Sequence, residues 1–383
     1  MEDYLSWVEI DKRALLSNIA SFRKLVSPEI KFLAVVKGNA YGYGLVEVSQ
    51  IAKDKIDWFG VNNLDEALTL KNLGIDKPIL ILGYTQNSRL PEVIKNDFRQ
   101  VIYNKETALA LIKLKKPAKV HLKIETGTNR QGVSEKDLAE IVKILKNSAV
   151  VIEGVSTHFA TLEEEENAFY KVQLERFKEQ LELLKRFGIN PPLKHTASTA
   201  AAFLYPETYF NMVRVGIGLY GLWPSELVKK LAKKKGIKFE LKPVLTWKTK
   251  VVQVKNVKKG QTIGYGRTYS AKQNMRIAIL PVGYYDGYDR ALSNNSQVLI
   301  HGKFAPVVGR VMMNMIIVDI THIGGVQVED EVVLIGKQVV SREAVKRSGS
   351  QNEITAEELA EKIGTINYEI VSRINPLLPR IIV

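Results

Sequence analysis

Short apolar runs alternate with longer amphipathic segments along the first two-thirds of the chain. The apolar runs are rich in valine, isoleucine and leucine, which is typical of buried strands. Between them, apolar residues recur every three or four positions, which predicts helices. Residues 164–188 are a long example, and Gly188 is placed to cap the C-terminal end of that helix. The predicted strands cover residues 31–36, 58–61, 79–82, 100–103, 119–124, 150–156, 193–196 and 212–218.

This alternation predicts a (β/α)8 barrel of the TIM type. About eight strand–helix repeats fit such a barrel, whereas a doubly wound sheet, the alternative, would be favoured by a GxGxxG turn that the sequence lacks. After Trp223 a polar connector leads into β-type segments separated by glycine-containing turns. We therefore predict a barrel over residues 1–235 and a mostly antiparallel, β-rich domain over residues 236–383. About the first ten residues could pack with the second domain.

Composition narrows the functional classes. The chain has 383 residues, 45% of them hydrophobic, which is enough for two domain cores. It has no cysteine, which excludes disulfides, thiolate metal sites and cysteine nucleophiles and fits a reducing compartment. Charged residues interrupt the N-terminal segment, and no run reaches the roughly 18–20 apolar residues of a membrane helix. We expect a cytoplasmic protein without a membrane partner.

The net charge of +14 raises nucleic acid as a partner. The excess consists of dispersed lysines, for example in residues 113–119 and 228–242. Such lysines are typical of solvated helix faces and linkers, and no nucleic-acid-binding motif is present. We therefore expect no nucleic-acid partner, although a basic surface could favour anionic small molecules.

Polar residues gather where the predicted barrel strands end, which is where barrel enzymes place their active sites. Lys37 follows the first strand, Lys123 ends the fifth, His158 follows the sixth and Arg214 lies within the eighth. A lysine at a strand end is more often a solvated loop residue, so the convergence carries more weight than any single position. The other residues at this rim are Arg130, Ser198, Thr199, Gly216 and Ile217.

Two of these rim segments are suited to a phosphate, the helix start at Ser198 and Thr199 and the turn at Gly216 and Ile217. A helix start offers backbone N–H groups and hydroxyls, and barrels often bind phosphate after their seventh and eighth strands. A phosphate-bearing cofactor close to a barrel-end lysine suggests pyridoxal phosphate, since a desolvated lysine amine forms Schiff bases with it. The residues themselves therefore point to pyridoxal phosphate chemistry at Lys37.

With these segments in view, the sequence resembles alanine racemases along nearly its whole length. The resemblance implies pyridoxal 5'-phosphate as cofactor, an amino acid as substrate, and a homodimer whose subunits share each active site. It also implies racemisation of L-alanine to D-alanine for peptidoglycan synthesis. The segments that carry the resemblance, in the family's order, are "AVVKGNAYGYG", "STHFAT", "HTAS", "MVRVGIGLYG", "IGYGRTY", "PVGYYDGY" and "GRVMMNM".

The resemblance also implies roles for individual residues. Lys37 would hold the cofactor, and Lys37 and Tyr265 would be the two bases on opposite faces of the substrate carbanion. Arg214 would face the pyridine nitrogen and, as a permanent cation, keep it unprotonated, which favours simple proton return. The remaining implied residues are the cofactor contacts Tyr41, His158, Thr199, Gly216 and Ile217, the substrate contacts Arg130 and Met313, the carbamylation site Lys123, and the access-corridor residues Glu163, Tyr284, Arg290 and Arg310.

Several alternatives stay open. Asn314 and Pro376 depart from residues common in the family, so a broad-spectrum or serine racemase is possible from sequence. A barrel-type amino-acid decarboxylase would carry an acid opposite the pyridine nitrogen, which Arg214 argues against. A non-catalytic, pyridoxal phosphate-binding barrel would lack the β-rich domain that contains Tyr265.

Overall fold

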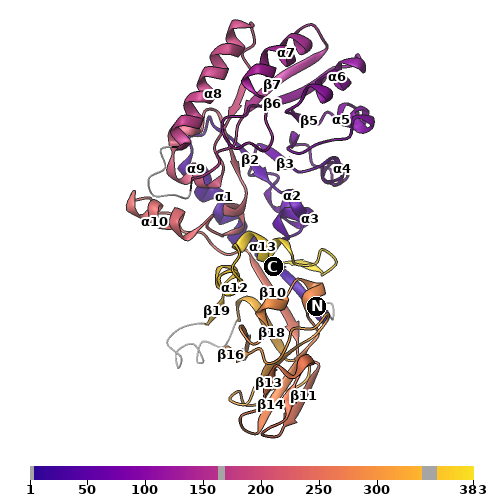
Figure 1. The fold of residues 1–383 in the computed structure, drawn as a ribbon, viewed down its shortest axis with the longest axis vertical. Coiled ribbons are helices and arrows are strands. Elements are labelled where there is room, and N and C mark those ends of the chain that lie inside the picture. Colours follow the sequence, from indigo (N-terminus) through magenta and orange to yellow (C-terminus); the bar gives the residue numbers. More distant parts are fainter. Residues whose placement is uncertain (1–3, 163–168, 339–351) are drawn as a thin grey trace. The chain divides into compact units, whose positions relative to one another are not determined.

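The computed structural model describes residues 4–162, 169–338 and 352–383 (Figure 1). The chain divides into two compact units. One unit, here the barrel unit, comprises Arg13–Ala40 and Val48–Lys242, and the other, here the β unit, comprises Met1–Lys12, Tyr41–Glu47 and Pro243–Val383. Within the described ranges, no helix is long and apolar enough to cross a membrane.

Eight parallel strands form the sheet of the barrel unit, in the order β8-β7-β6-β5-β4-β3-β2-β9. The backbone N–H groups of Asn211 and Arg214 donate to the carbonyls of Lys194 (3.3 Å) and Ala197 (3.0 Å). These bonds link β9 to β8, so the sheet is nearly closed and the predicted (β/α)8 barrel is confirmed. The strands are β2 (Lys31–Val35), β3 (Trp58–Val61), β4 (Ile79–Ile81), β5 (Arg99–Ile102), β6 (Ala118–Lys123), β7 (Val150–Ser156), β8 (Leu193–His195) and β9 (Met212–Val215).

Helices cover the outer face of this sheet (Figure 1). Helix α7 illustrates why the sequence forms them: Ser134 caps its first turn by accepting from the Asp137 N–H (3.2 Å), and Leu138, Ile141 and Leu145 lie on one buried face. The helices are α1 (Lys12–Leu25), α3 (Leu45–Ala52), α4 (Leu64–Asn72), α5 (Leu90–Lys95), α6 (Lys105–Lys113), α7 (Glu135–Lys146), α8 (Phe169–Arg186), α9 (Thr199–Leu204) and α10 (Glu226–Lys234), with 3-10 turns η1 (Asn87–Arg89), η2 (Pro206–Thr208) and η3 (Ile217–Tyr220).

The helix predicted over residues 164–188 is described from Phe169 to Arg186, because residues 163–168 lie outside the described ranges. Gly188 follows it with φ +76° and donates its N–H to the Lys185 carbonyl (2.8 Å), a common way to end a helix.

Helix α1 packs against an aromatic cluster in the barrel unit. The ring of Phe22 lies 4.9 Å from the rings of both Phe203 and Phe239, measured between centroids. The buried side chain of Asn18, one turn earlier on α1, donates to the carbonyls of Leu219 (3.0 Å) and Lys242 (2.8 Å). Helix α1 is therefore held to the segment after β9 by both apolar packing and buried hydrogen bonds.

The β unit contains a 7-stranded sheet, a 3-stranded sheet and a 2-stranded ribbon. The strands of the largest sheet are β16 (Lys303–Pro306), β15 (Gln297–Ile300), β18 (Glu331–Lys337), β10 (Leu245–Lys250), β1 (Ser6–Ile10), β20 (Arg380–Ile382) and β19 (Glu353–Ile354). The other strands are β11 (Gln253–Val257), β14 (Met275–Leu280), β17 (Ile316–Asp319), β12 (Thr262–Ile263) and β13 (Tyr269–Ser270), and the helical segments are α12 (Ala356–Ile363), α13 (Asn367–Ser372), η4 (Tyr265–Arg267), η5 (Tyr284–Asp286) and η6 (Arg290–Leu292).

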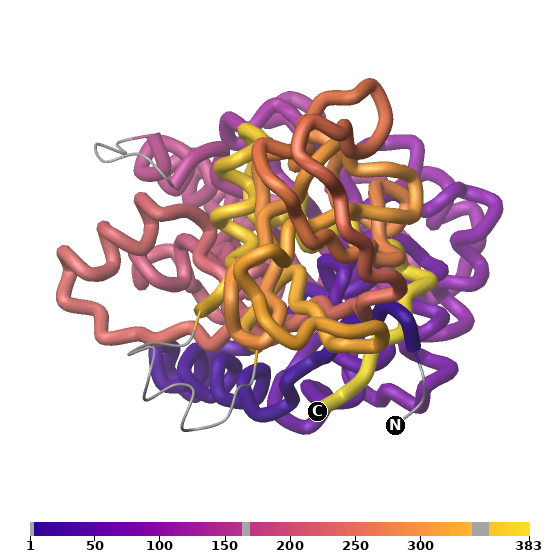
Figure 2. The backbone as a smooth tube through the Cα atoms, turned by 90° about the horizontal axis from the view of Figure 1, so that it is seen from below, coloured from indigo at the N-terminus to yellow at the C-terminus, as the bar shows by residue number. Residues whose placement is uncertain are grey.

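Strand β1 lies inside the largest sheet of the β unit. It pairs with β10 in an antiparallel arrangement and with β20 in a parallel one, which sets Val8 beside Arg380. Figure 2 shows the indigo start of the chain next to its yellow end. The described strands confirm a mostly β fold for this part of the chain.

Candidate active site

Lys37 stands where the first barrel strand gives way to an unusual turn. The segment α2 (Lys37–Tyr41) is not an ordinary helix, because Gly38, Asn39, Ala40 and Tyr41 all have φ between 53° and 64°. Three of the four are not glycine, so the turn is strained by about 1–2 kcal/mol for each such residue. Strained backbone of this kind concentrates at functional sites.

The carboxylate of Glu66 holds this turn in place. It accepts hydrogen bonds from the backbone N–H groups of Gly38 (2.6 Å), Asn39 (3.3 Å) and Asn62 (2.7 Å). Glu66 is itself fixed at the first turn of α4, where its N–H donates to the side chain of Asn63 (2.9 Å). One carboxylate thus connects the loops that follow β2 and β3.

Cations gather around Lys37 at the C-terminal end of the barrel strands. Although part of the Lys37 side chain reaches solvent, its pKa is lowered by burial of the amine and then by the charge of Arg130. Burial, followed by the charges of Arg130 and Arg214, lowers the pKa of Lys123 from 10.5 to about 8. Glu125 partly offsets these charges, but its carboxylate also accepts the backbone N–H of Gly127 (2.6 Å).

Arg214 is buried and firmly oriented. Its Nη1 donates to the His195 carbonyl (2.6 Å) and to His195 Nδ1 (2.9 Å). Its Nη2 donates to the carbonyls of Thr157 and Thr196 (2.9 Å each) and lies 3.4 Å from His158 Nδ1. Within the described residues, these bonds all start from the two Nη atoms. The Nε–H therefore remains as a donor for a further acceptor.

The segments after β8 and β9 meet beside this arginine. The N–H of Gly216 donates to the hydroxyl of Thr199 at the start of α9 (3.0 Å). Ile217 begins η3, and the hydroxyl of Tyr220, the last residue of η3, donates to the carbonyl of Val35 (2.9 Å). This bond ties the loop after β9 to the strand that leads to Lys37.

The β unit holds the remaining predicted residues in a second, exposed group. Tyr265 lies in η4 and is 71% exposed, and Met313 is 55% exposed. Arg310 packs against the backbone of Gly266, where an added Cβ would lie 3.0 Å from its guanidinium carbon. The N–H of Tyr284 donates to the carbonyl of Met312 (3.0 Å), which joins the η5 turn to the loop that contains Met313.

The structure thus brings together the predicted residues of each unit separately. Those of the barrel unit are Lys37, Lys123, Arg130, His158, Thr199, Arg214, Gly216 and Ile217. Those of the β unit are Tyr265, Met313, Tyr284, Arg290 and Arg310, whereas Tyr41, assigned to the same unit, lies in the α2 turn and not in this exposed group. The ring of Tyr41 lies 6.1 Å from that of Tyr368, and burial raises the pKa of Tyr41 to about 12. Glu163 lies outside the described residues.

Sequence reasoning missed Glu66 and the polar residues behind Arg214. The spacing of Asn63 and Glu66 is that of a helix-capping pair, which could have marked Glu66 as an N-terminal residue of α4. His121 lies between two apolar residues in β6, and Glu153 interrupts the apolar run of β7. A polar side chain in a buried strand needs a polar partner, so its presence in the sequence could have predicted a buried polar contact.

Comparison with known proteins agrees with this arrangement. Residues 10–224 match the family model described as "Alanine racemase, N-terminal domain", and residues 244–382 match "Alanine racemase, C-terminal domain". A curated alanine racemase from Leptospira interrogans is 38% identical over 390 aligned residues, covering 100% of this chain and 97% of the relative. One from Methanococcus maripaludis is 39% identical and covers 98% of both chains.

Solved structures of similar proteins lead to the same result. The alanine racemase from Bacillus anthracis with bound L-Ala-P superposes with a TM-score of 0.90 at 36% identity, over 100% of this chain and 96% of that one. The Clostridium difficile enzyme in complex with cycloserine gives a TM-score of 0.88 at 34% identity, with the same coverage. Since both domain models match and full-length relatives share more than a third of its residues, the chain belongs to the alanine racemase family.

Proposed function

We propose that this protein interconverts L-alanine and D-alanine with pyridoxal 5'-phosphate as cofactor, and that it supplies D-alanine for peptidoglycan in the cytoplasm. The observation that carries the proposal is the position of Lys37 at the barrel rim among cations, where burial lowers the pKa of its amine, in a chain of the alanine racemase family. In this proposal the barrel, residues 1–235, holds the cofactor, and the β-rich domain, residues 236–383, contributes the second base.

The residues of the barrel unit fit the proposed cofactor. Lys37, Lys123, Arg130 and Arg214 bring positive charge to one rim, and burial together with mutual repulsion lowers the pKa of both lysines. An anion, such as a phosphate or the substrate carboxylate, would relieve this repulsion. The Nε–H of Arg214 can only donate, so it suits an unprotonated ring nitrogen. Thr199, Gly216 and Ile217 of this unit would hold the phosphate, and the same role is proposed for Tyr41, which ends the turn that starts at Lys37.

Bound pyridoxal phosphate would supply an electron-withdrawing ring that makes the α-hydrogen of the amino acid easier to remove. Lys37 would carry the proton on one face of the α-carbon, because desolvation lowers the pKa of its amine and raises the neutral fraction. Tyr265 would carry the proton on the opposite face. Arg130 and the backbone at Met313 would orient the substrate carboxylate, and His158 would pack behind the ring.

We propose a homodimer in which Lys37 of one subunit meets Tyr265 of the other. The β unit supports this idea because several large apolar or aromatic side chains are exposed together near η4 and η5. Tyr265 (71%), Tyr284 (44%), Tyr285 (57%) and Met313 (55%) belong to this exposed group. An exposed tyrosine faces water. It can act as a base in a closed active site only if another protein surface covers it.

Subunit mixing tests the shared site directly. Lys37→Ala and Tyr265→Phe should each inactivate the homodimer. Mixed after unfolding and refolding, the two variants should recover about a quarter of the wild-type activity, since half of the dimers are hybrids and each hybrid restores one of two sites. If the two bases came from the same subunit, mixing would restore nothing. Tyr285→Phe is the matched control for Tyr265→Phe and should stay active.

Two further measurements test the cofactor and the substrate. The purified protein should be yellow, and borohydride should fix the cofactor to Lys37, which Lys37→Ala should prevent while Lys31→Ala should not. Deuterium exchange at the α-carbon in D₂O across a panel of L-amino acids then tests specificity. Exchange with serine but not with alanine would favour the alternative, a serine racemase of the same fold.

A further inference from the structure

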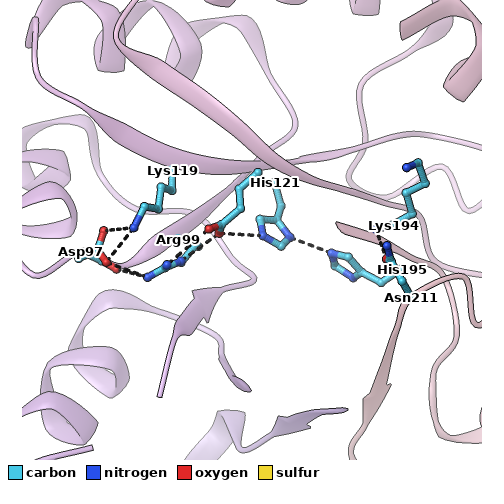
Figure 3. Close-up of polar contacts among 8 residues, drawn as sticks. Asp97, Arg99, Lys119, His121, Lys194, His195 and Asn211 are labelled. Atoms are coloured by element: carbon cyan, nitrogen blue, oxygen red, sulfur yellow. Dashed lines mark hydrogen bonds and ion pairs between the residues drawn. The ribbon is translucent and has the colours of Figure 1, made fainter. Parts of the chain in front are cut away.

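A line of polar side chains leads away from Arg214 through the barrel. Figure 3 shows its part from His195 through His121 towards Arg99. Arg214 on β9 contacts His195 on β8, and His195 Nε2 lies 2.8 Å from His121 Nδ1 on β6. His121 Nε2 lies 3.6 Å from a carboxylate oxygen of Glu153 on β7. Both imidazoles are fully buried, at 0% and 1% exposure for His121 and His195.

The chemistry of arginine gives this line a direction. A guanidinium only donates, so His195 Nδ1, 2.9 Å from Arg214 Nη1, must be an unprotonated acceptor. The proton of a neutral His195 then sits on Nε2 and is donated to His121 Nδ1. By the same reasoning His121 carries its proton on Nε2, which faces Glu153. Each imidazole is therefore neutral and restricted to a single tautomer.

The surrounding electrostatics agree with this assignment. Burial first, and then the charge of Arg214, lowers the pKa of His195 well below its ordinary value. Burial also lowers the pKa of His121, although the nearby Glu153 acts in the opposite direction. Protonating either ring would set two N–H groups against each other or add a second buried cation near Arg214. The Glu153 carboxylate, 3.6 Å from His121 Nε2, is too far for a direct hydrogen bond, but its negative charge favours the proton on that nitrogen.

A β-bulge between β6 and β7 positions His121 and Glu153, the last two residues of this line. The pairing of β6 with β7 shifts register between Val120 and His121, and Glu153 is the extra residue on β7. Bulges of this kind re-aim side chains and occur next to active sites. The following residue must be glycine, because a Cβ on Gly154 would lie 2.4 Å from His121 Nδ1.

Glu153 is held from its other side as well. Arg99 donates through Nε to Glu153 Oε2 (3.0 Å) and also contacts the Asp97 carboxylate (3.1 Å). The indole of Trp58 lies 5.2 Å from the Arg99 guanidinium and 5.6 Å from the His121 ring, measured to the ring centroids. Glu153 is thus the only carboxylate in contact with His121 among the described residues, whereas Asp97 contacts Arg99 and Lys119.

We propose that Glu153 and His121 are positioning residues for Arg214. The directional line from Arg214 through His195 and His121 to Glu153 keeps both imidazoles in the Nε2–H tautomer. In that tautomer His195 accepts from Arg214 and fixes the guanidinium, so that its Nε–H would remain available to the cofactor ring. The link to the cofactor rests on the proposed function, while the tautomer assignment does not.

Nuclear magnetic resonance of the full-length enzyme labelled with ¹⁵N-histidine tests the tautomers directly. The chain has five histidines, and the exposed His301 and His322 can be assigned by replacement with glutamine. Long-range ¹H–¹⁵N spectra should show Nδ1 unprotonated and Nε2 protonated in both His121 and His195 from pH 6 to 8. An Nδ1–H tautomer or a protonated ring at either residue would overturn the proposal. The wild-type spectra suffice, so this test does not depend on whether a variant folds.

Two matched variants test the effect on Arg214. Glu153→Gln removes the carboxylate at the end of the line, and Asp97→Asn removes the other carboxylate bound to Arg99. We expect Glu153→Gln to lower kcat about tenfold, with KM nearly unchanged, and to shift the absorption band of the bound cofactor. Asp97→Asn should change neither. Equal effects of the two variants would mean that Glu153 merely holds Arg99, and the proposal would fail. A wild-type enzyme inactive on alanine would instead contradict the proposed function, while the tautomer spectra would still decide this inference.

Discussion

Replacing Glu66 by glutamine should loosen the left-handed turn that follows Lys37. Glutamine keeps the shape of the side chain but offers one acceptor oxygen instead of two. That oxygen can accept from the N–H groups of Gly38 and Asn39 or from the N–H group of Asn62, but not from both sides. The amide N–H₂ of glutamine then faces the backbone N–H that has lost its acceptor. The variant therefore removes a charge-assisted hydrogen bond and creates a donor–donor contact in the same place.

The expected loss follows from the geometry. Hydrogen bonds to a charged group contribute about 1.5–3 kcal/mol each, and the position of this one near solvent argues for the lower part of that range. The three non-glycine residues of the turn store about 3–6 kcal/mol of backbone strain, so the turn relaxes once its restraint weakens. We estimate about 2 kcal/mol of lost local stability, which corresponds to roughly thirtyfold faster opening.

Amide hydrogen exchange is the suitable assay because it reports local opening. Peptides covering residues 36–41 should exchange about thirty times faster in Glu66→Gln than in the wild-type protein, the factor expected from about 2 kcal/mol. The control is Asp65→Asn on the same turn of α4. The side chain of Asp65 is 73% exposed, and its replacement removes only an ion pair with Arg89. Exchange that rises equally in both variants, or in neither, would refute the role given to Glu66.

Four further outcomes are expected. Between pH 8 and 10.5 the unfolded chain protonates Lys123 while the folded chain does not, because burial lowers the pKa of Lys123 from 10.5 to about 8. The contribution of this lysine to stability should therefore rise with pH across this window, and Lys123→Met should make the rise in thermal melts smaller, with the remainder coming from groups such as Lys37. At the same position, ¹³C-bicarbonate at pH 8 should give a carbamate resonance that is missing from Lys123→Met. Gly42→Ala should destabilise far more than Gly74→Ala in melting experiments, because both have positive φ but only the Cβ at Gly42 would meet a backbone oxygen, that of Val371, at 2.0 Å. Asn18→Ala should lower Tm by roughly 5–10 °C, since it strands buried backbone groups worth about 1–3 kcal/mol each.

Periodicity predicted the barrel well because parallel barrel strands are buried on both faces. The runs at 58–61 and 150–156 coincide with β3 and β7, and the others differ by one to three residues at an end. The strand predicted over residues 212–218 ends at Val215, because Gly216 adopts φ −112° and ψ −99° and a 3-10 turn follows. Periodicity could not place β1, since a strand five residues long carries no information about a partner that is distant in sequence.

The candidate site was predictable where a residue's own chemistry marks it. Lys37 and Arg214 are charged residues in or beside buried strands, and that contrast is visible in sequence. Glu66 and Glu153 act through backbone geometry instead, one by accepting from a left-handed turn and the other through a bulge. Neither a turn of that hand nor a register shift has a clear signature in a single sequence, so these residues emerged only from the structure.

The parallel pairing of β1 with β20 has a consequence for how the chain folds during synthesis. Strand β1 finds one of its two neighbours only when the segment around Arg380, far later in the chain, has been made. The barrel strands, by contrast, pair with neighbours that are mostly next in sequence, so they can assemble while translation continues. Residues 6–10 therefore have no sheet partner until β10 has been made, and their second edge stays unpaired until β20 follows. Their alternation of buried and half-buried positions, rather than a continuous apolar run, limits their tendency to aggregate during that wait.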